Sequence, residues 1–284
     1  MKINYVKNLN DGSLRIEPIS FWKALLLSFL FDIILSAVSI PSDTFFAWYN
    51  KLFFSNSIVL NSISIITNFI YQYGAMLIIV IIINRSFKLD NDVLYKNPTD
   101  KKKYFAAAGM IIGYILLTYG AIDMILYSLP TLNDGLYEYL EEYLVNTSFI
   151  FIFLETCIMA PIFEEILYRG ILLNGLLKKY NYKKAIIFSA LIFGIAHMNL
   201  PQGINAFFLG TIIGLAYYYT KSIYVCMLMH FVNNFLVNFV IYPESNLWTI
   251  ILFVLIPIIG AIVLIKSLKI IKAEEGVQNG QESC

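Results

Sequence analysis

The sequence predicts an all-α, polytopic membrane protein in which about eight transmembrane helices enclose a polar intramembrane cavity. Composition is the first observation behind this prediction, because 59% of the 284 residues are hydrophobic and 14% are charged. Soluble proteins average about 45–50% apolar and about 25% charged residues. The second observation is that the apolar residues gather in runs close to the 20 or so residues that a helix needs to cross a bilayer.

The same composition excludes several other classes of protein. A formal net charge of +1 creates no field that would steer a nucleic acid to the surface, so we expect no nucleic-acid partner. The three cysteines, Cys157, Cys226 and Cys284, are too few for a disulfide framework, and their spacing fits no zinc ribbon.

Eight apolar segments are the candidate membrane spans. They run near residues 21–40, 63–83, 105–129, 148–177, 185–197, 204–220, 223–242 and 248–269. Pro161 falls in the middle of the fourth and longest segment, where we expect a kink or a break in the helix.

The distribution of lysine and arginine predicts the orientation of these spans. Basic residues cluster in the N-terminal tail, between residues 85 and 103, between 178 and 184, and between 266 and 272. Lys221 lies in the loop between the sixth and seventh predicted spans, on the same side of the membrane as these clusters. The alternate loops hold only Lys51. Cytoplasmic loops carry the excess of basic residues. We therefore expect a multi-pass protein of the cell membrane with both termini in the cytoplasm.

A few ionisable residues fall inside the predicted spans, where each is costly and therefore a functional candidate. They are Asp32, Asp123, Glu155, Glu164, Glu165, Arg169, His197 and His230, and the two histidines are the only ones in the chain. We expect Asp32 and Asp123 to be hydrogen-bonded packing residues or to face a cavity. Glu155 is expected at the outer mouth of that cavity.

The fourth predicted span contains the sequence FEEILYRG. Glu165 and Arg169 are four residues apart, so they share one face of a helix and are expected to form an ion pair. Glu164 is rotated by about 100° from Glu165 around the helix axis. It is therefore the freer carboxylate and the candidate general base.

The fifth and seventh predicted spans each carry a histidine. The fifth is the shortest, and with its bounds extended to 182–200 both histidines lie inside their spans. His197 follows Phe193 by four residues, and His230 precedes Asn233 and Asn234 by three and four. Imidazole exchanges protons near neutral pH, and an amide with an imidazole N–H can stabilise an oxyanion. Together with a glutamate base, these groups suit the hydrolysis of an acyl bond.

Other chemistries fit the sequence less well. Two histidines and a glutamate could bind zinc, but HExxH is missing and the histidines lie on different helices. No GxSxG nucleophile elbow is present. From spacing alone, a polar packing network and a proton or substrate path in a transporter stay open beside a hydrolase.

Taken together, the motifs EExxxR (Glu164–Arg169), FxxxH (Phe193–His197) and HxxxN (His230–Asn234) resemble the CPBP family, also called Abi. That family includes type II CAAX prenyl endopeptidases and bacteriocin-processing or self-immunity proteins. The resemblance divides the chain into an N-terminal transmembrane region (1–147), a CPBP-like catalytic core (148–242), and a last span with a polar cytoplasmic tail (243–284).

The resemblance implies an intramembrane glutamic endopeptidase that needs no metal and no cofactor. In such enzymes the first glutamate of EExxxR and the histidine of FxxxH activate water, which assigns Glu164 and His197. The second histidine and the asparagine, His230 and Asn234, would form the oxyanion hole. The supporting residues would be Glu165, Arg169 and Phe193.

The implied partners are the lipid bilayer and a membrane-embedded or membrane-anchored peptide or protein, the substrate. The sequence does not specify the cleavage site, a prenyl group on the substrate, or the oligomeric state. A non-catalytic membrane protein that binds or regulates, as in bacteriocin immunity, and a transporter stay open as alternatives.

Overall fold

The computed structural model describes residues 7, 10, 16–53, 66, 67, 70, 74, 101–127, 149–239 and 247–281. Every element within these ranges is a helix, so the predicted all-α class is confirmed for the described part of the chain. The predicted second span, 63–83, lies outside the described residues apart from the positions just given, and the side chain of Asp123 lies outside them too.

Six of the predicted spans are single helices in the described part of the chain. They are α2 (Phe21–Phe53), α4 (Lys101–Tyr127), α10 (Tyr182–Ala196), α11 (Leu200–Thr220), α12 (Ile223–Phe239) and α13 (Leu247–Gln281). Helices α2 and α13 continue well beyond the predicted ends of their apolar segments. Hydropathy marks the part of a helix that suits the bilayer, whereas the helix itself can continue into polar sequence.

The fourth predicted span is one continuous helical segment that changes register. It consists of α7 (Phe149–Ile152), the π-helix η1 (Phe153–Met159), α8 (Ala160–Glu165), the π-helix η2 (Ile166–Leu173) and α9 (Asn174–Leu177). The sequence predicts a kink or break at Pro161, but the helix continues through it. The N–H of Ala160 donates to the carbonyl of Glu155, five residues back. This wider register accommodates a proline, which has no N–H to contribute.

The junction between α10 and α11 determines where His197 lies. Helix α10 ends at Ala196, with His197 as its C-cap, because Met198 adopts a left-handed backbone conformation with φ 53°. Asn199 then starts α11, its Oδ1 accepting the N–H of Gln202 at 3.1 Å. His197 therefore lies at the C-terminal end of its helix, whereas the sequence predicts a position inside the span.

Glycines allow α10 and α11 to approach each other closely. A methyl group on Gly194 would lie 2.6 Å from the carbonyl oxygen of Gly203, and one on Gly210 would lie 3.2 Å from Cα of Ala190. Gly214 faces Ile186 in the same interface. The GxxxG spacing of Gly210 and Gly214, which allows helices to approach closely, therefore serves packing inside the molecule.

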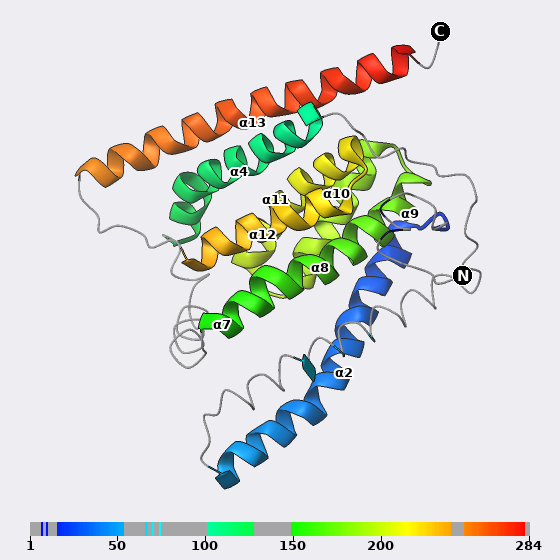
Figure 1. Ribbon diagram of the computed structural model, residues 1–284, viewed down its shortest axis with the longest axis vertical. Coiled ribbons are helices and arrows are strands. Elements are labelled where there is room, and N and C mark those ends of the chain that lie inside the picture. Colours follow the sequence, from blue (N-terminus) through cyan, green and yellow to red (C-terminus); the bar gives the residue numbers. More distant parts are fainter. Residues whose placement is uncertain are drawn as a thin grey trace.

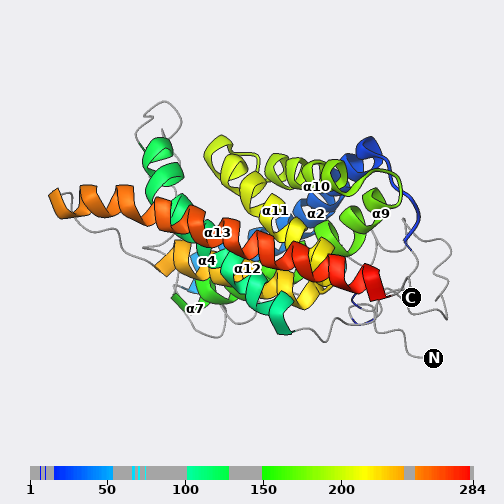
Figure 2. The same cartoon turned by 90° about the horizontal axis from the view of Figure 1, so that it is seen from above.

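Helices α4 and α13 lie side by side along one side of the molecule (Figures 1 and 2). Their backbones nearly touch, because a methyl group on Gly113 would lie 2.8 Å from the carbonyl oxygen of Gly260. Helix α4 also contacts α11 and α12, and α2 contacts α10. The π-helix η2 packs against α10, α11 and α12, and all eight of its residues are buried. It is the central element around which the polar site forms.

The outer helices expose apolar side chains. In α2, Trp22 is 74% exposed, and in α13, Val254 is 59% exposed. Two helices of the described residues are long and apolar enough to cross a membrane, over Leu200–Thr220 and Val254–Ala273. An apolar outer face is unfavourable in water and is the expected state in lipid, so the fold is consistent with a membrane protein. The arrangement of eight spans stays a prediction.

Candidate active site

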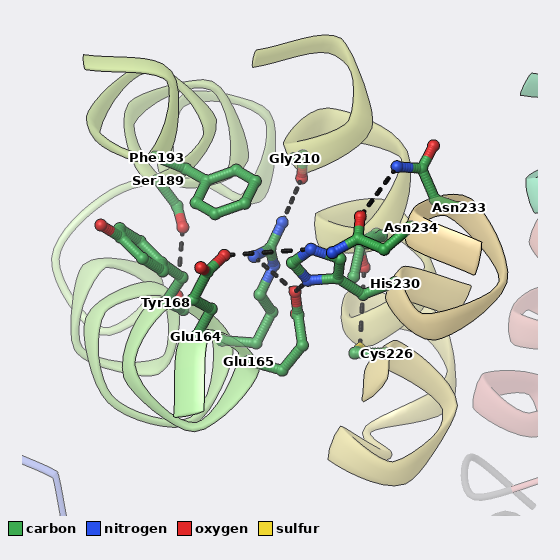
Figure 3. Close-up of polar contacts among 12 residues, drawn as sticks. Glu164, Glu165, Tyr168, Ser189, Phe193, Gly210, Cys226, His230, Asn233 and Asn234 are labelled. Atoms are coloured by element: carbon green, nitrogen blue, oxygen red, sulfur yellow. Dashed lines mark hydrogen bonds and ion pairs between the residues drawn. The ribbon is translucent and has the colours of Figure 1, made fainter. Parts of the chain in front are cut away.

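The site is built on a buried ion pair between Glu165 on α8 and Arg169 on η2 (Figure 3). Nη1 of Arg169 donates to Oε1 of Glu165 at 2.9 Å, and the two side chains are 1% and 0% exposed. Nη2 of Arg169 donates to the carbonyl of Gly210 on α11 at 3.2 Å. The guanidinium carbon also lies 4.9 Å from the centroid of the Phe193 ring on α10. Arg169 thus connects three helices while its charge is balanced by Glu165.

His230 on α12 shares the same carboxylate. Its Nδ1 donates to Oε1 of Glu165 at 2.8 Å (Figure 3). Because a carboxylate can only accept, Nδ1 carries a proton, and in the neutral ring Nε2 is then the acceptor. Glu165 therefore orients His230 as well as neutralising Arg169. Sequence reasoning missed this contact, because the two residues are 65 positions apart and no local pattern joins them.

Glu164 faces the other nitrogen of His230. Its Oε2 lies 3.9 Å from Nε2 of His230, which is longer than a hydrogen bond. This oxygen is buried and has no hydrogen-bond partner among the described residues. The Glu164 side chain is 28% exposed, however, against 0% for Glu165. Oε2 of Glu165 and Nε of Arg169 are likewise buried without a hydrogen-bond partner among the described residues. Exposure therefore distinguishes Glu164 as the carboxylate of the pair that a small molecule can reach.

Phe193 lies between the two histidines. Its ring packs edge-on against His197 at 4.9 Å and against His230 at 5.8 Å, measured between ring centroids. Nδ1 of His197 donates to the carbonyl of Phe193 at 2.8 Å, which leaves Nε2 as the acceptor in the neutral ring. Within the described residues no hydrogen bond joins His197 to Glu164, so their joint role stays a prediction.

The asparagines of α12 face the π-helix η1. Nδ2 of Asn234 donates to the carbonyl of Thr156 at 2.8 Å, and Nδ2 of Asn233 donates to Oδ1 of Asn234 at 3.1 Å. Asn238, one turn further on, donates to Oγ1 of Thr156 at 3.2 Å. Sequence reasoning did not single out Thr156 or Asn238. The signal that could have identified Asn238 is its spacing, because His230, Asn234 and Asn238 follow one another at intervals of four residues.

Helix α2 brings another carboxylate toward the cluster. Oγ of Ser28 and the hydroxyl of Tyr168 form a hydrogen bond of 2.9 Å. Asp32 lies one turn further along α2, where it interacts electrostatically with Glu164. Asp32 is therefore part of the surroundings of the glutamate pair, and its packing or cavity-facing role stays a prediction.

The polar cluster is packed. Glu165, Arg169 and His230 are almost completely buried, and Glu164 is the partly exposed member. A groove of about 570 Å³ opens instead between α10 and α11. Its lining is almost entirely apolar and includes Leu191, Ile195, Met198, Leu200, Ile204 and Phe207. The polar cavity predicted from the sequence thus corresponds, in this part of the chain, to a close-packed cluster beside an apolar groove.

No group of three His, Cys, Asp or Glu side chains in the described ranges converges closely enough to hold a metal ion. The Glu165 carboxylate binds Arg169 and the imidazole of His230 instead.

Fold and site together define a helical membrane protein with a buried Glu-Arg-His cluster. Residues 146–236 match the family model described as "Type II CAAX prenyl endopeptidase Rce1-like". The chain is 34% identical over 90 residues to the protein described as "Putative membrane peptidase YdiL" of Bacillus subtilis (strain 168). That alignment covers 31% of this chain and 37% of the relative, so the chain matches little more than a third of the relative's length. No solved structure matches.

Residues 146–236 are therefore similar to the Rce1-like family, which agrees with the resemblance carried by the three motifs. The structure brings Glu164, Glu165, Arg169 and His230 into one cluster. It packs His197 edge-on against the Phe193 ring and joins Asn234 to η1.

Proposed function

We propose that the protein is an intramembrane endopeptidase, which hydrolyses a peptide bond of a membrane-embedded or membrane-anchored protein or peptide. The observation that carries the proposal is the position of Glu164. Its buried Oε2 has no hydrogen-bond partner in the described residues and lies 3.9 Å from Nε2 of a histidine that Glu165 orients. The match of residues 146–236 to the Rce1-like family supports the same function.

Glu164 is the general base in this proposal. The 3.9 Å between Oε2 of Glu164 and Nε2 of His230 is too long for a direct hydrogen bond. The exposed part of the Glu164 side chain, which is 28% exposed, is where we expect a water molecule to bind. The carboxylate takes a proton from this water as its oxygen attacks the carbonyl carbon of the peptide bond. A positioned base of this kind contributes about 10²- to 10⁴-fold to a rate.

The charges of the cluster determine what His230 can donate. Glu164, Glu165 and Arg169 sum to one negative charge when both carboxylates are ionised, so one additional proton makes the buried cluster neutral. We assign that proton to Nε2 of His230, because Nδ1 already donates to Glu165 and Glu164 has to be ionised to act as the base. With the proton on Nε2, His230 donates to the oxyanion that forms on the carbonyl oxygen.

Asn234 supplies the second oxyanion donor. An asparagine amide has two N–H groups, and one of them donates to the carbonyl of Thr156. The other is available to the substrate. His197, whose Nε2 is an acceptor in the neutral ring, takes up the proton that Glu164 has accepted from water and delivers it to the leaving amine as the C–N bond breaks.

The proposed setting is a multi-pass protein of the cell membrane with both termini in the cytoplasm, in which Glu164 acts without a metal or another cofactor. The alternation of basic loops supports this orientation.

The function is tested by comparing the membrane peptides of cells that produce the wild-type protein with those of cells that produce Glu164→Gln. Mass spectrometry should detect shortened peptides only with the wild type. Glu17→Gln is the matched control, because Glu17 is exposed and lies outside the cluster. Identical peptide profiles for all three proteins would contradict the proposal. A Glu164→Gln protein that fully complements a deletion strain would favour the non-catalytic alternative.

A further inference from the structure

The carbonyl group of Thr156 lacks the partner that a regular helix would provide. In an α-helix it would accept the N–H of Ala160, four residues on, and in a π-helix that of residue 161. The Ala160 N–H donates instead to the carbonyl of Glu155. Residue 161 is a proline and has no N–H. The π register and Pro161 together therefore leave one backbone acceptor free, inside the bundle.

Asn234 on α12 satisfies this acceptor. Its Nδ2 donates to the Thr156 carbonyl at 2.8 Å, and its Oδ1 accepts from Nδ2 of Asn233 at 3.1 Å. A donor on one side and an acceptor on the other determine which way the amide faces, since a flipped amide would oppose two oxygens and two nitrogens. The second N–H of Asn234 consequently has a fixed direction.

Asn238, one turn further along α12, also contacts Thr156. Its Nδ2 donates to Oγ1 of Thr156 at 3.2 Å and to the backbone carbonyl of Asn234 at 2.7 Å. The Thr156 hydroxyl in turn donates to the carbonyl of Ile152 at 2.7 Å. Thr156 therefore binds α12 through both its carbonyl and its hydroxyl, and each donor has an acceptor.

We propose that Pro161, Thr156 and Asn238 are positioning residues that orient Asn234 as an oxyanion donor. The inference rests on the proposed endopeptidase function, in which the second N–H of Asn234 binds the transition state. Pro161 acts by withholding a backbone N–H from the Thr156 carbonyl. Asn238 acts by fixing Thr156 relative to α12.

Pro161→Ala is the most direct test. An alanine here restores a backbone N–H, and either helical register then gives the Thr156 carbonyl a backbone donor that competes with Asn234. Misplacing a group in an active site by about 1 Å can reduce the rate about 100-fold. With a purified membrane peptide that is cut in cells as the substrate, we expect kcat of Pro161→Ala to fall about 10- to 100-fold. KM should stay within about twofold of the wild type, because Asn234 contacts the oxyanion only in the transition state.

Pro257→Ala is the matched control, since Pro257 also lies inside a helix, α13, which packs mainly on α4. It should leave kcat unchanged. Pro161→Ala should also have little further effect in an Asn234→Ala background, because residues that act through one group are not additive. Equal kcat values for Pro161→Ala and Pro257→Ala would overturn the proposal. So would a double variant whose kcat is lowered by the product of the factors measured for Pro161→Ala and for Asn234→Ala alone.

Thr156→Val and Thr156→Ser test the same device if Pro161→Ala does not fold. Valine keeps the shape of threonine without its hydroxyl, so the contact with Asn238 is lost and kcat should fall several-fold. Serine keeps the hydroxyl and should retain the wild-type kcat. Equal values for the two variants would contradict the positioning role. A wild-type protein that cleaves no membrane peptide would instead contradict the proposed function, whatever the variants do.

Discussion

Replacing Arg169 by methionine is expected to destabilise the protein strongly. Methionine has a similar length but cannot donate to Oε1 of Glu165 or to the carbonyl of Gly210, which Arg169 contacts at 2.9 and 3.2 Å. Glu165 is 0% exposed, so its charge would remain buried with His230 as its remaining partner. Removing one member of a buried ion pair typically costs about 3–5 kcal/mol of unfolding free energy.

This prediction is measured by denaturant titration of the purified protein in detergent micelles. Lys183→Met is the control, since Lys183 is an exposed basic residue and surface substitutions usually change the free energy of unfolding by less than about 0.5 kcal/mol. The double variant Glu165→Gln with Arg169→Met should be more stable than Arg169→Met alone, because the uncompensated charge is gone. An Arg169→Met protein within about 0.5 kcal/mol of the wild type would refute the structural role of this ion pair.

Three further predictions follow from the packing and from the proposed chemistry. Gly260→Ala places a methyl group 2.5 Å from the backbone nitrogen of Leu117 and 2.7 Å from the carbonyl oxygen of Gly113. Because neither backbone can move easily, the same titration should show that the free energy of unfolding falls by about 1–3 kcal/mol. An unchanged midpoint would show that α4 and α13 do not pack this way. His197→Gln removes the proposed proton carrier and should lower kcat about 100-fold without shifting the unfolding midpoint, whereas undiminished cleavage would exclude that role. Protein stripped with a chelator and checked for metal content should retain its cleavage rate, and a rate that falls and is restored by zinc would contradict the metal-independent proposal.

Contacts between residues close in sequence could be predicted from helical spacing. Glu165 and Arg169 are four apart on one helix, and their ion pair forms at 2.9 Å. The Gly210–Gly214 spacing likewise predicts a close helix contact, and both residues face α10. In each case a fixed rise and turn per residue places the side chains without knowledge of the rest of the fold.

Contacts between helices and changes of helical register could not be predicted in this way. The hydrogen bond from His230 to Glu165 joins α12 to α8 and depends on how those helices pack. The end of α10 at Ala196 depends on one backbone angle, that of Met198, which hydrophobic periodicity does not encode. The π register around Pro161 was also missed, because a proline in a helical pattern ordinarily indicates a kink or an end.

The central claim is that Glu164 activates the water that breaks a peptide bond. It is tested most directly by incubating a purified membrane peptide that is cut in cells with the purified protein in water enriched in ¹⁸O. The wild type should produce a fragment whose new carboxyl group carries one ¹⁸O atom after a single turnover. Glu164→Gln, folded to the same extent, should produce labelled fragment at least about 100-fold more slowly. Labelled fragment forming at the wild-type rate with Glu164→Gln would contradict the account.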